Sequence, residues 1–158
     1  MKAKFIKESS VGLSCIMLPQ DANTMGNVHG GVIMKHIDNT AAVAAMRHVR
    51  SNAVTASIDR LDFHSPVFVG NLLKLKAGIN YTGKTSMEIG VRVETEDLLT
   101  GEVRHTASAY LTFVALDENG RPKEIPPVII ESDEEIRRNF EAAERRRRRL
   151  AERQSEKT

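Results

Sequence analysis

The chain has 158 residues, of which 41% are hydrophobic and 28% charged, a composition that suits one globular domain and excludes a disordered chain. Cys15 is the single cysteine, so the chain cannot form an internal disulfide, and we expect a cytoplasmic protein. The net charge of +2 depends on five consecutive arginines, 145–149, because without them 18 basic residues would face 21 acidic ones.

The first half of the sequence predicts a strand, a loop and a long helix. Residues 10–18 alternate in polarity as a strand does, and residues 19–30 are rich in Asn, Gly and Asp. Residues 31–49 contain no proline and carry apolar side chains around most of a helical circumference, which is typical of a buried helix. The many alanines in this helix allow close approach of the structure that surrounds it.

The second half predicts an antiparallel sheet. Residues 53–63 are rich in strand-forming residues, residues 72–81 and 86–94 alternate in polarity, and residues 102–116 form a long last strand. Successive strands joined by short turns are typical of an antiparallel sheet. The economical packing for one apolar helix and several consecutive strands is a single sheet curved around the helix. The fold class predicted is therefore α+β.

A charged helix is predicted at the C-terminus. Ser132 and Glu135 have the spacing of a capping box, and a helix should continue from there to about residue 153. Its apolar stripe is thin, and it contains the arginines of residues 145–149. We interpret the arginine run as a solvated helix face, with an RNA-binding patch as the alternative.

Asp38 is the most informative polar residue. It lies in the middle of the predicted buried helix, where a carboxylate is costly unless it is paired or functional. An ion pair with Lys35, one turn earlier, explains it as well as a chemical role does.

The loop before the helix is the second candidate feature. Asn23 precedes a Gly30–Gly31 pair that opens the helix, and amide groups at a helix start can stabilise a developing oxyanion. A simple capped loop explains the same residues. The sequence has no zinc-ligand spacing, no GxSxG elbow and no phosphate-binding loop, so it does not indicate metal-dependent or covalent serine catalysis.

Taken together, these motifs resemble the hotdog-fold acyl-CoA thioesterases, in particular the short bacterial and archaeal acyl-CoA hydrolases related to the brain-type enzyme. The resemblance rests on Asn23, the His29-Gly30-Gly31 group, Asp38 and the stretch 85–88. It extends over most of the chain, through residues 17–38, 53–75, 81–97 and 106–127.

The resemblance implies a hotdog fold, in which an antiparallel sheet wraps around one long central helix, with a C-terminal helix added. It implies a thioesterase domain at 8–127 and a charged helical tail at 128–158. It also implies a dimer whose two sheets join, commonly assembled into a trimer of dimers.

The resemblance further implies a site at the dimer interface, where Asn23 and Asp38 come from different subunits. Asp38 would act as general base or nucleophile, and Asn23 would orient water or substrate. The amides at His29, Gly30 and Gly31 would polarise the thioester carbonyl. Coenzyme A would contact residues of two segments, namely Thr55, Ala56, Ser57, Lys84, Thr85 and Ser86. No metal or cofactor is expected, since coenzyme A is part of the substrate.

Three other functions compete with hydrolysis. A non-catalytic acyl-CoA-binding protein would share the fold, although both Asn23 and Asp38 are present. A hotdog dehydratase would need a histidine–acid pair, for which His29 or His36 would be the candidates. Nucleic-acid binding through the arginine run is not favoured, because the chain has no Trp, two Tyr and five Phe to stack on bases. No membrane partner is expected, because no apolar run approaches the roughly 18 residues of a span.

Overall fold

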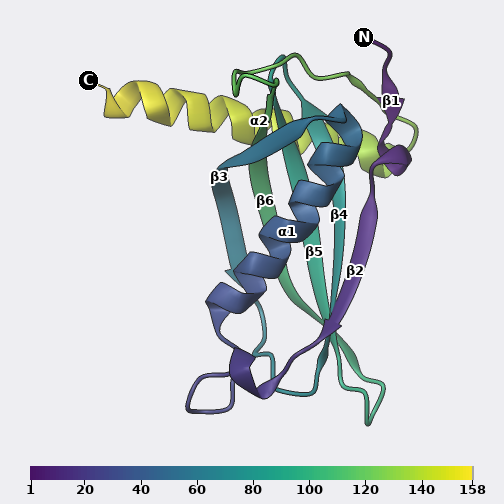
Figure 1. Ribbon diagram of the computed structural model, residues 1–158, viewed down its shortest axis with the longest axis vertical. Coiled ribbons are helices and arrows are strands. Elements are labelled where there is room, and N and C mark those ends of the chain that lie inside the picture. The colour runs from purple at the N-terminus through teal and green to yellow at the C-terminus, as the bar shows by residue number, and fades with distance from the viewer. Residues whose placement is uncertain (158) are drawn as a thin grey trace.

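The structure is a computed structural model, and it describes residues 1–157 (Figure 1). Two short 3₁₀ helices, Ile6–Glu8 and Pro19–Asp21, flank the second strand. The remaining elements in chain order are β1 (Lys4–Phe5), β2 (Val11–Ile16), α1 (Gly30–Val49), β3 (Asn52–Phe63), β4 (Leu72–Thr82), β5 (Ser86–Glu96), β6 (Val103–Leu116), β7 (Val128–Ile129) and α2 (Asp133–Glu156).

Five strands form one antiparallel sheet in the order β2-β4-β5-β6-β3, and α1 lies across one face of it while α2 crosses the other (Figure 1). The predicted α+β architecture, a sheet around one long helix with a further C-terminal helix, is confirmed. The predicted strands agree with the observed ones to within two residues. A small parallel pair of β1 and β7, which the sequence did not indicate, joins the two ends of the domain.

The face toward α1 is apolar and tightly packed. Ala41, Ala44 and Ala45 of α1 are fully buried, and their small side chains bring the helix close to the strands. Opposite them lie the inward residues of the central strands, including Leu73, Leu75, Ile79, Ile89, Val93, Leu111 and Phe113. Burying an aliphatic or aromatic side chain of this size contributes about 1.5–3 kcal/mol.

The face toward α2 is held by charge. Arg145 donates two hydrogen bonds to Glu88 of β5, at 2.9 and 2.7 Å, and its guanidinium stacks 3.7 Å from the centre of the Tyr110 ring. Glu88 is only 4% exposed and also accepts a hydrogen bond from Asn80 at 3.0 Å. Further along the helix, Arg149 pairs with Asp59 at 2.6 Å. The interpretation of the arginine run as a solvated face is therefore wrong for Arg145 and Arg149, because the sheet offers each of them a carboxylate.

The start of α2 is capped as predicted. The Ser132 hydroxyl accepts a hydrogen bond from the amide of Glu135 at 3.1 Å. The Glu135 carboxylate returns to the amide of Glu131, at 3.5 Å, rather than to that of Ser132. Three acidic residues in the first turn complement the helix dipole.

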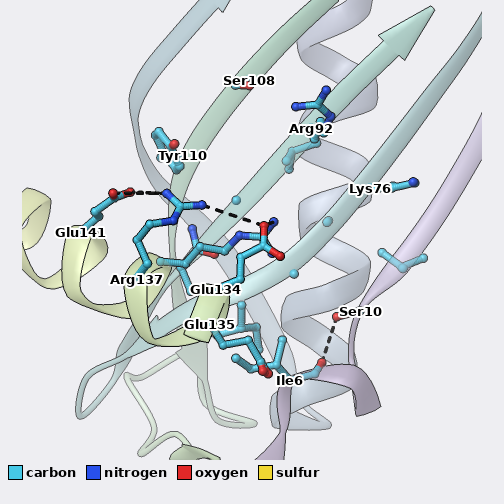
Figure 2. Close-up of a pocket in the computed structure, with 18 of the residues that line it drawn as sticks. Ile6, Ser10, Lys76, Arg92, Ser108, Tyr110, Glu134, Glu135, Arg137 and Glu141 are labelled. Carbon is cyan, nitrogen blue, oxygen red and sulfur yellow. Dashed lines mark hydrogen bonds and ion pairs between the residues drawn. The ribbon is translucent and has the colours of Figure 1, made fainter. Parts of the chain in front are cut away.

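A cavity of about 650 Å³ lies between α2 and the outer face of the sheet (Figure 2). Its floor includes Gly12, Gly78 and Gly90, which contribute no side chains, and its wall includes Arg137, whose guanidinium pairs with Glu141. None of the predicted site residues lines it.

Strand β3 forms one edge of the sheet and is irregular. Its register with β6 shifts between Thr55 and Ser57 and again between Ile58 and Arg60, which marks two bulges. Val54, Ile58 and Phe63 on this strand are 42%, 37% and 47% exposed. In residues 1–157 no helix is long and apolar enough to cross a membrane.

Candidate active site

Asp38 lies on the flank of α1 that faces β3, and it is half-buried. Its Oδ1 accepts a hydrogen bond from the Thr55 hydroxyl at 2.6 Å. Within residues 1–157 it forms no ion pair with Lys35 or any other cation, so the ion-pair explanation of this carboxylate is not observed. One carboxylate oxygen is thus fixed by a neutral donor, and the other is available to accept a proton or to attack a substrate.

Thr55 is a site residue whose role the sequence did not reveal. It was predicted only as a contact for coenzyme A, whereas its hydroxyl orients Asp38. The two residues are 17 positions apart, on a helix and on the strand after it, so no local spacing rule connects them. The signal that could have found the pair is strand pairing: Thr55 pairs with the core residue Phe113, so it lies on the face of the sheet toward α1.

Asn23 is held by its own loop. Its Oδ1 accepts hydrogen bonds from the amides of Met25 at 2.9 Å and Asn27 at 3.2 Å, and its backbone amide donates to the Asn27 carbonyl at 2.7 Å. The carboxamide oxygen is therefore committed to the loop. The Nδ2 group donates to no acceptor within the described residues, so the side chain presents N–H donors to a ligand.

The first turn of α1 offers two further donors. His29 is the N-cap, and its amide donates to the Asp21 carbonyl at 2.9 Å. The amides of Gly30 and Gly31 have no acceptor in the part of the chain that the structure describes, as expected for a helix start. Of the three predicted oxyanion residues, Gly30 and Gly31 thus carry the open N–H groups.

The structure does not bring all predicted site residues together within one chain. Asn23 lies at the end of the sheet where β2 meets β4 at the Ile16–Leu72 pair. The β4–β5 hairpin, with Lys84, Thr85 and Ser86, lies at the opposite end (Figure 1). No interaction joins Asn23 or the hairpin to Asp38 among residues 1–157. Ala56 and Ser57 follow Thr55 on the exposed part of β3, and Ala56 falls outside the register with β6.

Other nucleophiles and ligands are not assembled here. Cys15 packs against the core, and burial raises the pKa of its thiol, so it is a poor nucleophile. His36 lies beside it, with a ring nitrogen 3.8 Å from the sulfur. Within the described chain, no group of three His, Cys, Asp or Glu side chains is placed to hold a metal ion.

Comparison with known sequences identifies the family. Residues 25–102 match the sequence model of the thioesterase superfamily. An acyl-CoA thioester hydrolase of Bacillus subtilis, described as uncharacterized, is 40% identical over 144 residues, which make up 91% of this chain and 84% of that protein. The chain belongs to the thioesterase superfamily.

Solved thioesterase structures superpose on nearly the whole chain and confirm the hotdog fold. An apo-hexameric acyl-CoA thioesterase is 40% identical, with a TM-score of 0.92 over 96% of this chain and 97% of that one. An acyl-CoA hydrolase from Staphylococcus aureus, in complex with butyryl coenzyme A, coenzyme A and coenzyme A disulfide, is 38% identical, with a TM-score of 0.90 over 98% and 94%.

The Staphylococcus aureus enzyme has also been solved as three single alanine variants. They replace an asparagine, an aspartate and a threonine. Each is 37% identical to this chain, with TM-scores of 0.92, 0.91 and 0.90, and covers at least 98% of it and 93% of the variant chain.

Proposed function

We propose that this protein hydrolyses acyl-CoA thioesters to a free carboxylic acid and coenzyme A. The observation that carries the proposal is the Asp38 carboxylate, half-buried in the middle of an apolar helix, with one oxygen held by Thr55 at 2.6 Å. Such a carboxylate is positioned but not neutralised by a cation. Relatives at about 40% identity that carry the name acyl-CoA thioester hydrolase support this substrate class.

The spacing of the candidate residues adds support. In the Staphylococcus aureus enzyme, the three replaced positions are an asparagine, an aspartate and a threonine separated by 15 and 17 residues. Asn23, Asp38 and Thr55 have the same order and the same two intervals. We therefore propose these three residues as the reactive group of this chain.

In the proposed reaction, Asp38 acts as general base on a water, or it attacks the thioester carbon directly, expels the coenzyme A thiolate and forms an anhydride that water then hydrolyses. As base, its free oxygen takes a proton while the water oxygen bonds to the thioester carbon, and the carbon–sulfur bond then breaks. The thiolate leaves readily and needs little acid assistance, so a single carboxylate suffices. Asn23 Nδ2 and the amides of Gly30 and Gly31 are donors for the negative charge on the carbonyl oxygen.

We propose that one working site combines two subunits. Among residues 1–157, no interaction connects Asn23 to Asp38. The exposed edge of β3 carries unpaired backbone groups beside apolar side chains, an arrangement that proteins rarely leave uncovered. Two chains joined through β3 would cover this edge and bring the Asn23 loop of one subunit toward Asp38 of the other. The hexameric state of related thioesterases supports a trimer of such dimers.

Coenzyme A would bind along the interface between the two subunits. The bulge at Ala56 leaves backbone polar groups free for the amides of the pantetheine arm, next to Thr55 and Ser57. The hairpin residues Lys84, Thr85 and Ser86 offer a cation, hydroxyls and turn amides for the phosphates. No metal or further cofactor enters the proposal.

The first test is an assay of purified protein that detects released thiol from acyl-CoAs of increasing chain length, with and without EDTA. Activity should persist in EDTA, and Asp38→Asn should lower kcat by at least about a hundredfold, because it removes the base and keeps the shape. Near-normal turnover of a folded Asp38→Asn variant would contradict the mechanism. Binding of acyl-CoA without turnover by the wild type would indicate a binding protein instead.

The second test addresses the shared site. Asn23→Ala and Asp38→Ala should each be nearly inactive. Co-refolded mixed dimers would have one site with both defects and one intact site, so activity should return to about half per mixed dimer. If demonstrably mixed dimers stay inactive, both residues serve the same subunit.

A further inference from the structure

Strand β3 is held from both of its faces, and only one of the two contacts belongs to the proposed reactive group. Toward α1, the Thr55 hydroxyl donates to Asp38 at 2.6 Å. Toward α2, the Asp59 carboxylate accepts a hydrogen bond from Arg149 Nη1 at 2.6 Å. Thr55 and Asp59 are four positions apart on one strand, and this short segment connects the candidate catalytic carboxylate with the C-terminal helix.

The segment from Thr55 to Arg60 is the least regular part of the sheet. Both register shifts of β3 fall between Thr55 and Arg60, and Ala56 and Asp59 are the residues without a partner in β6. Figure 1 shows β3 bending sharply along its length. A bulge bends its strand and leaves the extra residue out of the ladder. Thr55 is the last residue in register before the first bulge, so the course of the strand directly after Thr55 depends on what fixes the bulged segment.

The fixing contacts converge on Asp59. Besides Arg149, its carboxylate accepts hydrogen bonds from Thr112 on the neighbouring strand and from Ser57 on β3, both at 3.3 Å. The Asp59 and Arg149 side chains are 16% and 15% exposed, so solvent screens their attraction less than that of a surface pair. The adjacent Arg148 is exposed and has no partner within residues 1–157.

The helix reaches Asp59 because it is itself fixed to the sheet. Asn139 donates to the Asn80 carbonyl of β4 at 3.0 Å, and Arg145 pairs with Glu88 of β5. From Asn139 to Arg149 the helix rises about 15 Å, which matches the width from β4 to β3, three strand spacings of about 4.8 Å. The helix is therefore long enough to place Arg149 beside β3, the edge strand.

We propose that Arg149 is a positioning residue for the reaction: it fixes the bulged segment of β3 through Asp59 and thereby keeps the Thr55 hydroxyl on Asp38. The inference rests on the proposed function, and it assigns to the arginine-rich C-terminal helix a role in catalysis without any contact with substrate.

The test compares Arg149→Ala with Arg148→Ala, its unpaired neighbour. Arg149→Ala should lower kcat about tenfold, in the range expected when a distant change misplaces a reacting group, while KM stays within about twofold. Arg148→Ala should keep wild-type kcat, and Arg149→Lys, which keeps a single charged contact, should fall between them. Asp59→Asn, which preserves side-chain shape, should lower kcat by a similar factor. It takes the place of Arg149→Ala in the test if that variant folds poorly.

A double-mutant cycle with Thr55→Val separates positioning from general destabilisation. Because Arg149 acts through the Thr55 hydroxyl, adding Arg149→Ala to Thr55→Val should lower kcat by less than about twofold. An undiminished tenfold loss in that background, or unchanged kcat of Arg149→Ala and Asp59→Asn in an active wild-type protein, would overturn the inference. A wild-type protein that does not hydrolyse acyl-CoA would instead overturn the proposed function and the inference together.

Discussion

On one face of the sheet, α1 meets the strands through alanines and aliphatic side chains; on the other, α2 meets them through arginines and the carboxylates of Glu88 and Asp59. The apolar contact is continuous, whereas the charged contact leaves a cavity of about 650 Å³ beside it. Apolar packing depends on shape over a whole surface, but an ion pair fixes a helix at a point. The two helices should therefore respond to different perturbations.

The largest stability effect should come from the charged face. Glu88→Ala leaves Arg145 part-buried without its carboxylate, which should lower the free energy of unfolding by about 3 kcal/mol or more. Glu94→Ala is the matched control, on the same strand and the same face, since Glu94 is 24% exposed and pairs with the exposed Arg92. The control should cost no more than about 1 kcal/mol. Equal losses in denaturant unfolding would contradict the view that a few buried charges hold α2.

On the apolar face, added volume should matter instead of charge. Ala44 is fully buried between α1 and the sheet, so Ala44→Leu should destabilise the protein by about 1–3 kcal/mol. Ala42→Leu makes the same change at a half-buried position two residues earlier and should cost less. Thermal unfolding of both variants measures the difference. A neutral Ala44→Leu would mean that the contact with α1 is loose.

The smallest effect concerns His48, a polar exception on the apolar face. Burial lowers the pKa of His48, against an opposing effect of its hydrogen bond to the Pro126 carbonyl. The unfolded chain, with a histidine pKa near about 6.5, then binds more protons than the folded one, so stability should fall as the pH drops below about 6.5. His48→Gln should flatten that part of the curve of unfolding free energy against pH. An unchanged slope would assign the pH dependence to other groups.

The sequence was sufficient for the apolar face because alternation in the strands and alanine spacing in α1 report burial directly. For the charged face, the sequence did not predict which side chains hold α2 to the sheet. Glu88 alternates with apolar residues in the sequence, and nothing in that pattern shows that α2 covers it. Which arginine of the 145–149 run finds a carboxylate depends on where α2 crosses each strand, and that crossing is a tertiary property.

The candidate site divides in the same way. Asn23 and Asp38 could be proposed from the sequence, because a carboxylate in an apolar helix is unusual and both residues match the motif of the resembling family. The contact of Thr55 with Asp38 could not, because it joins a helix to a strand 17 positions later. Beyond Thr55, two bulges place Asp59 on the α2 side of the sheet although it lies an even number of positions from Thr55. A residue count along a strand predicts its faces only while the ladder stays regular. Asn80 illustrates the same limit: the register of β4 with β5 shifts between Ile79 and Tyr81, and Asn80 is buried.

Gly90 has a consequence for how the charged face can change in evolution. A Cβ atom at this position would lie 2.7 Å from Asn80 Nδ2, the group that donates to Glu88 beneath Arg145. A larger residue at position 90 would therefore displace the Asn80 amide. It would weaken the support of Glu88, and with it the attachment of α2 to the sheet, without any change in the helix itself. A smaller side chain at position 80 would make room for such a residue, so the two positions should change together across related chains.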